Sequence, residues 1–246
     1  MRYFLRLSYD GTHYHGWQRQ PNVLSVQESI EIALEKVLKR RVSLIGCGRT
    51  DAGVHASGYI AHIDIPDALP VSFLAKINFA LPEDIAIHRA WEVERGLHAQ
   101  FSAINRTYHY HLHTRKSPFV RHHSTLLHDG TEKLDWDAMQ AAADYLLDHS
   151  EYKGCCKVPE KHDSTICQIS EAQFVRHGEH DWCFQITGNR FLRGMVRLLV
   201  AQLINIGTGK DKVADFKARL QAGERPDHFV YALAQGLRLY SVRYPE

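Results

Sequence analysis

Three kinds of signal are missing from this sequence of 246 residues. No apolar run approaches the roughly 20 residues that a membrane-spanning helix needs, and the first ten residues lack the apolar stretch of a signal peptide. The five cysteines show no C-x-x-C spacing, which favours reduced thiols over a disulfide framework. We therefore expect a cytoplasmic protein without a membrane partner.

A strong net charge is also lacking, because the formal total is only +2. The charges are nevertheless unevenly distributed, since residues 11–27, 95–128 and 182–210 contain no Asp or Glu. All three windows carry arginine, and the middle one also carries seven histidines. Such acid-free segments favour a positive cleft that binds a polyanion, most simply nucleic acid.

Hydrophobic patterning predicts two similar halves that each mix strands with helices. Alternation predicts strands over residues 2–9, 42–47, 59–65, 85–94, 106–114, 167–177, 181–187 and 237–244. Helical spacing predicts helices over residues 26–39, 70–81, 135–148, 191–206 and 213–222. Ser25 and Glu28 form a capping box before the first helix.

This pattern predicts an α+β fold of two layers, with mixed, mostly antiparallel sheets and helices packed on one side. We place the domain boundary near Ala103. The expected domains are an N-terminal α/β domain of residues 1–103 and a C-terminal α/β domain of residues 104–246.

The stretch G46-C-G-R-T-D-A-G-V-H-A-S-G58 holds the strongest candidates for chemistry. Its four glycines permit tight turns and the close approach of a ligand. Arg49 precedes Asp51 by two residues and can pair with it, which would keep the carboxylate ionised. An ionised Asp51 can act as a nucleophile or a base. The same pair could instead only stabilise a turn, and spacing alone leaves both interpretations open.

The strand predicted over residues 106–114 places His109, His111 and His113 on one face and Tyr108 and Tyr110 on the other. Imidazoles can bind a metal, but no matching carboxylate or cysteine spacing follows. We therefore expect no metal site and favour a row of histidines that faces RNA or solvent. Tyr108 could stack on a nucleobase or simply pack in the core.

Three arginines accompany the helix predicted over residues 191–206, at positions Arg190, Arg193 and Arg197. Side chains spaced three and four apart share one face of a helix. A positive stripe on an otherwise apolar helix suits contacts with phosphates. Ordinary amphipathicity is the alternative.

Eight blocks of this sequence resemble the tRNA pseudouridine synthase A (TruA-type) family, in the family's order and over nearly the whole chain. The two most specific are Y9-D-G-T-H-Y-H-G-W-Q-R-Q20 and G48-R-T-D-A-G-V-H55. The others are S25-V-Q-E28, N78-F-A-L-P-E-D-I85, H98-A-Q-F-S-A103, R106-T-Y-H-Y110, N189-R-F-L-R-G-M-V-R197 and G236-L-R-L239.

The resemblance implies an isomerase that needs no cofactor and converts uridine to pseudouridine at positions 38 to 40 of the tRNA anticodon stem-loop. It implies a two-domain pseudouridine synthase fold with a central basic cleft, and homodimers that share one tRNA. It also implies Asp51 as the nucleophile and Arg49 as its partner, able to enter the space left by a displaced base. The residues expected to bind the substrate are Tyr108, which would stack on the uracil, Arg106, His55, Arg190, Arg193 and Arg197.

The chemistry agrees with this resemblance. The uracil must leave C1′ through N1, rotate and rejoin through C5, which involves no redox change. The target base must first be flipped out of its stack, and an aromatic face in a closed pocket can hold it. Whether Asp51 attacks C1′, attacks the uracil ring or removes a ribose proton stays open. The alternatives are a non-catalytic RNA-binding module and a histidine-rich metal hydrolase.

Two positions depart from the family pattern. Gln100 stands where the family usually has arginine, so one phosphate or pairing contact is missing or supplied elsewhere. The segment E151-Y-K-G-C-C-K-V158 lacks the usual D-F-x-S-F form. These departures concern substrate contacts, and the intact Asp51 predicts an active enzyme.

Overall fold

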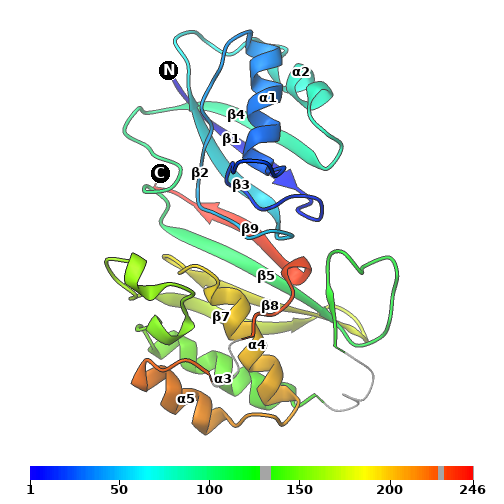
Figure 1. Cartoon of the computed structure of the whole chain (residues 1–246), viewed down its shortest axis with the longest axis vertical. Helices are drawn as coiled ribbons and strands as arrows, with labels where there is room; N and C mark the ends of the chain where they lie inside the picture. Colours follow the sequence, from blue (N-terminus) through cyan, green and yellow to red (C-terminus); the bar gives the residue numbers. More distant parts are fainter. Residues whose placement is uncertain (128–133, 227–229, 246) are drawn as a thin grey trace. The chain divides into compact units, whose positions relative to one another are not determined.

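The computed structural model describes residues 1–127, 134–226 and 230–245 and divides into two compact units (Figure 1). Unit 1 comprises Met1–Ile104 and Arg238–Glu246, and unit 2 comprises Asn105–Leu237. Both units combine strands with helices, so the predicted α+β class is confirmed. None of the helices in these described ranges is long and apolar enough to cross a membrane.

Unit 1 contains a mostly antiparallel sheet in the order β4-β1-β3-β9, with the short β2 paired to β3. Its elements are β1 (Arg2–Tyr9), α1 (Val26–Leu38), β2 (Ile45–Gly46), β3 (His55–Asp64), α2 (Phe73–Ala80), β4 (Ile85–Val93) and β9 (Leu237–Arg243). α1 and α2 pack against each other (Figure 1). Leu5 and Leu7 of β1 and Ile30 and Leu34 of α1 are fully buried in the core of this unit.

The C-terminal segment of residues 238–245 belongs to unit 1, whereas the expected C-terminal domain of residues 104–246 includes it. β9 pairs in parallel with β3, where Arg238 lies opposite His55. The ring of Tyr244 packs on Phe4 with their centroids 5.0 Å apart, and its hydroxyl donates to the Ala99 carbonyl. Pairing between strands this far apart in sequence leaves no local signal, so the hydrophobic pattern could not reveal it.

Unit 2 contains an antiparallel sheet in the order β5-β8-β7, with β6 parallel to β5. Its strands are β5 (Asn105–His113), β6 (Thr125–Leu126), β7 (Ile169–Arg176) and β8 (Asp181–Gly188). Its helices are α3 (Trp136–Asp148), α4 (Met195–Gly207) and α5 (Val213–Ala222), with short 3-10 helices over Lys153–Cys155, Pro159–Lys161 and Ala234–Gly236. α3 packs against β7, α4 and α5. Its Gln140 side chain accepts a hydrogen bond from the Phe174 N–H, 2.8 Å away, and so pairs a donor of the outer strand β7.

α4 begins at Met195, later than the predicted start at residue 191. Gly194 is its N-cap and has a φ of 76°, a left-handed conformation that favours glycine. Residues 189–194 therefore form a loop that carries Arg190 and Arg193, while Arg197 lies in the helix. The predicted stripe of three arginines along one helical face is wrong, because helical spacing does not extend across Gly194.

All five cysteines are buried and none forms a disulfide, as the irregular spacing predicted. Burial raises the pKa of Cys155 to about 12. Burial also raises the pKa of Cys167 to about 11. Both thiols therefore stay protonated near neutral pH and behave as small core residues.

The predicted N-cap of α1 gives a test of the local structure. The Ser25 side chain accepts a hydrogen bond from the Glu28 N–H at 3.3 Å, so Ser25→Ala should lower the free energy of unfolding by about 1 kcal/mol. Ser72 is the N-cap of α2 but makes no side-chain capping bond, so Ser72→Ala should change it by less than about 0.5 kcal/mol. Urea unfolding measures both, and equal losses would contradict the capping role.

Candidate active site

The candidate residues fall into two groups, one in each unit. Asp51, Arg49 and His55 belong to the segment between β2 and the start of β3 in unit 1. The second group lies on β5, in the loop of residues 189–194 and on α4 of unit 2, and comprises Arg106, Tyr108, Arg190, Arg193 and Arg197. Each group is positioned by contacts within its own unit.

The backbone of residues 10–17 holds the loop of residues 47–54, called here the Asp51 loop. The Trp17 N–H donates to the Thr50 carbonyl, and the Gly53 N–H donates to the Tyr14 carbonyl, both at 3.2 Å. Gly16 has a φ of 89°, and a Cβ there would lie 2.4 Å from the Thr50 carbonyl oxygen. Only glycine both adopts this positive φ readily and leaves room for the Thr50 carbonyl. The two most specific sequence blocks are thus two segments in direct contact.

Three buried aromatic side chains, from Tyr9, Trp17 and Tyr59, support the Asp51 loop. Trp17 stacks on Tyr59 with ring centroids 4.0 Å apart and an interplanar angle of 24°. The Tyr59 hydroxyl donates to the Gly48 carbonyl, and the Tyr9 hydroxyl lies 2.9 Å from Thr50 Oγ1. Hydrogen bonds made by buried hydroxyls are costly to lose, so this cluster fixes the chain on both sides of position 49.

Tyr14 anchors the 10–17 segment to the start of β4. Its hydroxyl donates to Asp84 Oδ1 at 2.6 Å, and the Asp10 N–H donates to the Asp84 carbonyl at 2.9 Å. Burial and the hydrogen bond to Asp84 raise the pKa of Tyr14 well above its ordinary value. The hydroxyl therefore remains a donor at physiological pH, and the anchor does not titrate there.

His55 closes the C-terminal end of the Asp51 loop and is only 2% exposed. Its Nδ1 atom lies 3.0 Å from both the Gly11 nitrogen and Asp10 Oδ1. This position ties the loop to the 10–17 segment. It favours a positioning role for His55 over the expected contact with substrate.

Asp51 is partly buried, and its carbonyl accepts a hydrogen bond from the Val54 N–H at 3.2 Å. Arg49 is exposed. The pairing expected from their spacing stays a prediction. The contacts that hold the loop are those with the 10–17 segment and the aromatic cluster.

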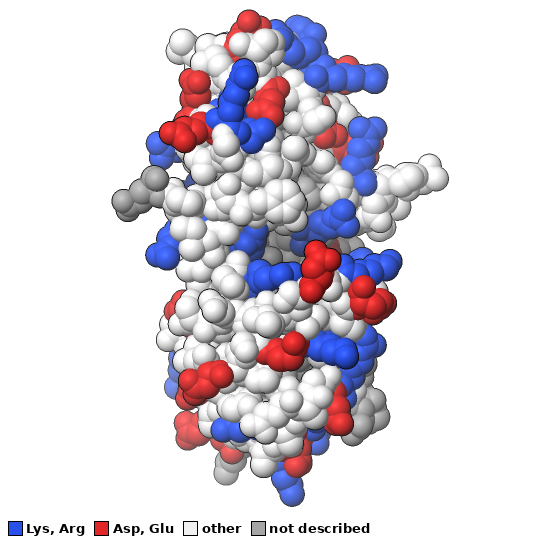
Figure 2. Space-filling view, turned by 90° about the vertical axis from the view of Figure 1, so that its left-hand side faces the viewer, with Lys and Arg blue, Asp and Glu red and all other residues white. Residues whose placement is uncertain are grey.

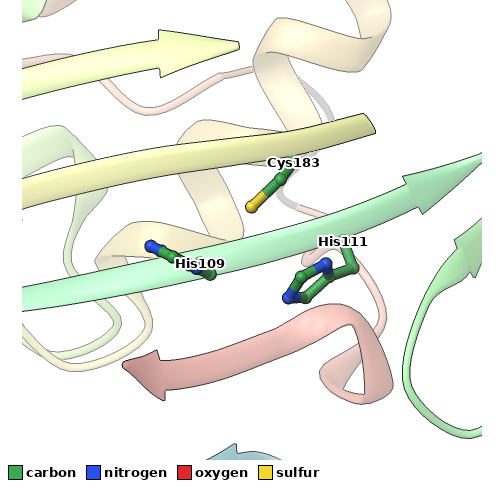
Figure 3. A group of neighbouring side chains, drawn as sticks. All are labelled: His109, His111 and Cys183. Carbon is green, nitrogen blue, oxygen red and sulfur yellow. The ribbon is translucent and has the colours of Figure 1, made fainter. Parts of the chain in front are cut away.

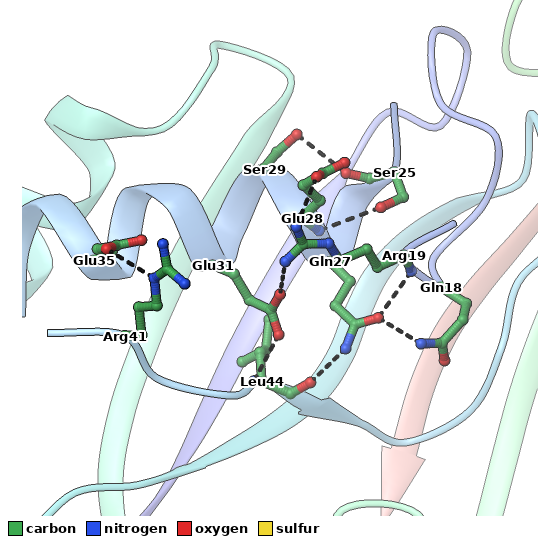
Figure 4. A network of polar contacts seen from close by, with 10 residues as sticks. All are labelled: Gln18, Arg19, Ser25, Gln27, Glu28, Ser29, Glu31, Glu35, Arg41 and Leu44. Carbon is green, nitrogen blue, oxygen red and sulfur yellow. Dashed lines mark hydrogen bonds and ion pairs between the residues drawn. The ribbon is translucent and has the colours of Figure 1, made fainter. Parts of the chain in front are cut away.

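Gln27 of α1 binds residues just after the 10–17 segment and just before the Asp51 loop (Figure 4). Its amide oxygen accepts from the Arg19 N–H at 2.9 Å and from Gln18 Nε2 at 2.8 Å, and its amide nitrogen donates to the Leu44 carbonyl at 2.8 Å. Glu31 accepts from the Leu44 N–H at 3.1 Å. In the sequence, Gln27 stands out only as part of the S25-V-Q-E28 block. Its role as a connector could not be predicted, because tertiary structure brings these partners to it.

One arginine from an acid-free window of the sequence lies beside acidic side chains in the folded unit 1. Arg19, from an acid-free window, lies 3.3 Å from Glu28 and 3.5 Å from Glu31 of α1. On the face drawn in Figure 2, basic and acidic side chains are interspersed on each unit. A window without acids in the sequence is therefore a weak guide to a basic surface.

In unit 2, the loop of residues 189–194 packs on β5. Tyr108 contacts Phe191 with ring centroids 5.1 Å apart and nearly perpendicular planes, at 87°. Arg106 donates to the Asn189 carbonyl at 3.1 Å. Two matching sequence blocks thus come together through Tyr108 and Arg106, both of which are partly buried.

The three arginines expected on one helical face have different surroundings. Arg197 Nε donates to the Ala232 carbonyl at 2.7 Å, and its guanidinium lies 5.4 Å from the centroid of the Tyr231 ring. Arg193 is exposed and Arg190 is partly buried. Arg197 therefore supports the segment around residue 232, whereas Arg193 presents its charge to solvent.

The two positions that depart from the family pattern have different surroundings. Gly154, Cys155 and Cys156 are buried, and a Cβ at Gly154 would lie 2.1 Å from the Glu224 carbonyl oxygen. The unusual segment thus uses small residues because it packs into unit 2. Gln100 is exposed, and its N–H donates to His98 Nδ1 at 3.1 Å.

A family model described as tRNA pseudouridine synthase matches residues 7–102 and 125–245. The chain belongs to the tRNA pseudouridine synthase family. Three curated relatives named tRNA pseudouridine synthase A illustrate the similarity. The protein of Bacteroides fragilis is 40% identical, over 100% of this chain and 97% of its own. The protein of Porphyromonas gingivalis is 39% identical, over 99% of this chain and 97% of its own. The protein of Chlamydia muridarum is 36% identical, over 98% of this chain and 91% of its own.

The family membership confirms the resemblance and does not favour a non-catalytic RNA-binding module. The matched ranges include Asp51, Arg49 and His55 of unit 1. Arg106 and Tyr108 lie between the two ranges. Their expected roles therefore depend on the R106-T-Y-H-Y110 block and on their contacts with residues 189–194.

A pair of glycine substitutions tests how the Asp51 loop is held. Gly16→Ala should lower the free energy of unfolding by more than about 1 kcal/mol, because alanine fits neither the positive φ nor the contact with Thr50. Gly48→Ala is the matched control, since no atom lies within 4 Å of a Cβ built there. It should leave stability unchanged or raise it slightly. Thermal unfolding measures both, and a tolerated Gly16→Ala would contradict the close contact.

Proposed function

We propose that this chain is an isomerase that converts uridine to pseudouridine in tRNA, at positions 38 to 40 of the anticodon stem-loop. The observation that carries the proposal is the Asp51 loop, whose sequence G48-R-T-D-A-G-V-H55 is held in place by the Y9-D-G-T-H-Y-H-G-W-Q-R-Q20 segment. Relatives named tRNA pseudouridine synthase A that align over the whole chain support it.

The reaction exchanges one glycosidic bond for another. The N1–C1′ bond of uridine breaks, the freed uracil rotates, and C5 bonds to C1′. The C5 hydrogen leaves as a proton and N1 takes up a proton, so the product is an isomer of the substrate. Nothing is oxidised or reduced, so the chemistry itself calls for no cofactor. A carboxylate can attack C1′, attack the uracil ring or remove a ribose proton, and Asp51 is the residue to which we assign that role.

The rigid setting of Asp51 suits this task. A carboxylate held in one place avoids the cost of ordering it in each catalytic cycle. The backbone bonds to Thr50 and Gly53, on either side of Asp51, provide that order in unit 1.

The remaining assignments concern the flipped nucleotide. Arg49 is exposed, so its side chain is available to enter the space that the displaced base leaves. Tyr108 stacks on the target uracil. Arg106, Arg190 and Arg193 contact backbone phosphates. Arg197 acts on the substrate indirectly, by holding the segment around residue 232.

Tritium release from unmodified tRNA that carries 5-tritiated uridine tests the proposal. The wild type should release tritium, because C5 must lose its hydrogen when the new bond forms. Asp51→Ala should release none while binding tRNA at least as well, since a carboxylate facing phosphates weakens binding. Arg49→Lys should lower the single-turnover rate by at least about tenfold, because a point charge does not replace a planar guanidinium.

Asp67→Ala serves as the matched control, since this exposed carboxylate of unit 1 pairs only with Arg40 among its described contacts. It should retain wild-type release. Release by Asp51→Ala would exclude the assigned role of Asp51. Tight tRNA binding without release by any variant, wild type included, would favour the RNA-binding module.

We further infer that the protein acts in the cytoplasm as a homodimer whose subunits share one tRNA, as the resemblance implies. Light scattering should therefore give twice the mass of the 28.2 kDa chain at micromolar concentration. A monomer mass that persists in the presence of tRNA would contradict the dimer.

A further inference from the structure

Two histidines and a cysteine meet on one face of the unit 2 sheet (Figure 3). In the antiparallel pairing of β5 and β8, Cys183 lies directly opposite His111. His109 is two residues away on β5 and therefore projects from the same face. The three ligand atoms, one from each residue, all lie within 4.8 Å of one another.

We propose that His109, His111 and Cys183 form a zinc-binding site. Zn²⁺ bonds to imidazole nitrogen and thiolate sulfur at about 2.0–2.3 Å with tetrahedral geometry. The ligand atoms of such a tetrahedron are separated by about 3.5 Å. The ligand atoms are thus near the required spacing. Small side-chain rotations would bring them to the distances of a zinc tetrahedron. Water would take the fourth position.

The donor set selects the class of metal. Hard cations such as Mg²⁺ and Ca²⁺ prefer oxygen ligands, which this cluster does not supply. Two imidazoles with one thiolate suit a borderline-soft ion. Cys183 is fully buried, whereas the two histidines are partly buried. A buried thiolate is costly alone but favourable beside a divalent cation, and the thiol releases its proton to water when the ion binds.

The third histidine of the row is excluded from the site by its own contacts. His113 is buried, and its Nδ1 lies 2.8 Å from Ser124 Oγ. It pairs across the strands with Asp181 and not with Cys183. The expectation of no metal here was based on the lack of a matching carboxylate or cysteine spacing along the sequence. The sulfur ligand comes from another strand.

The site is independent of the isomerase reaction proposed above. Alternation along β5 places Tyr108 on the opposite face from His109, so the ion does not reach the uracil. It would instead link β5 to β8 across the sheet. Since a ligand that binds only the folded state stabilises it, bound Zn²⁺ should raise the melting temperature.

Cobalt(II) is the probe, because a cobalt–thiolate bond gives a charge-transfer band in the near ultraviolet. The full-length protein, treated with chelator and reduced, should bind one equivalent of Co²⁺ with this band, and Zn²⁺ should displace it. Cys183→Ala should abolish the band. His109→Gln and His111→Gln should each weaken binding by at least about tenfold.

Two control variants in the same unit separate this site from other binding. His177 is exposed and Cys167 is buried elsewhere, so His177→Gln and Cys167→Ala should keep the band and the affinity. If circular dichroism shows that Cys183→Ala does not fold, the loss of Co²⁺ affinity in His109→Gln and His111→Gln decides whether the site exists. The site is ruled out if Co²⁺ binds without the band, if the band survives in Cys183→Ala, or if control and ligand variants lose affinity equally.

Discussion

The contact between Gly16 and the carbonyl of Thr50 is the constraint on which the candidate active site of unit 1 depends. It lets the backbone of residues 10–17 lie directly against the Asp51 loop, with hydrogen bonds from Trp17 and to Tyr14. The Gly16 carbonyl also accepts from the Val26 N–H at the start of α1. One backbone segment thus joins the helix, the loop and the buried aromatic cluster, and a side chain at position 16 would separate them.

Most elements of the fold could be predicted, because β1, α1, β5 and α3 carry clear local periodicity. The errors arose where local pattern competes with tertiary structure. Phe191 and Leu192 extend the helical apolar spacing before α4, yet Gly194 adopts a left-handed conformation and the helix begins only at Met195. The return of β9 to unit 1 depends on parallel pairing with β3, which no window of sequence encodes.

The residue assigned to catalysis was easier to predict from the sequence than the residues that position it. Asp51 stands in a rare glycine-rich motif, whereas Tyr59, Gln27 and His55 act through partners distant in sequence. The expected ion pair of Arg49 with Asp51 followed from proximity along the chain, whereas the backbone contacts that hold the loop come from residues 14–17. In the same way, the row of His109, His111 and His113 led to the expectation of no metal site, because no sequence spacing shows that strand pairing sets Cys183 opposite His111.

Amide hydrogen exchange in the tRNA-free protein tests most directly whether the 10–17 segment holds the Asp51 loop. The N–H groups of Gly53 and Trp17 donate between these two segments. They should therefore exchange slowly and open with similar free energies, as one cooperative unit. Exchange of the Gly53 amide at the rate of an unfolded peptide, while amides of β1 remain protected, would contradict the view that the loop is held before substrate arrives.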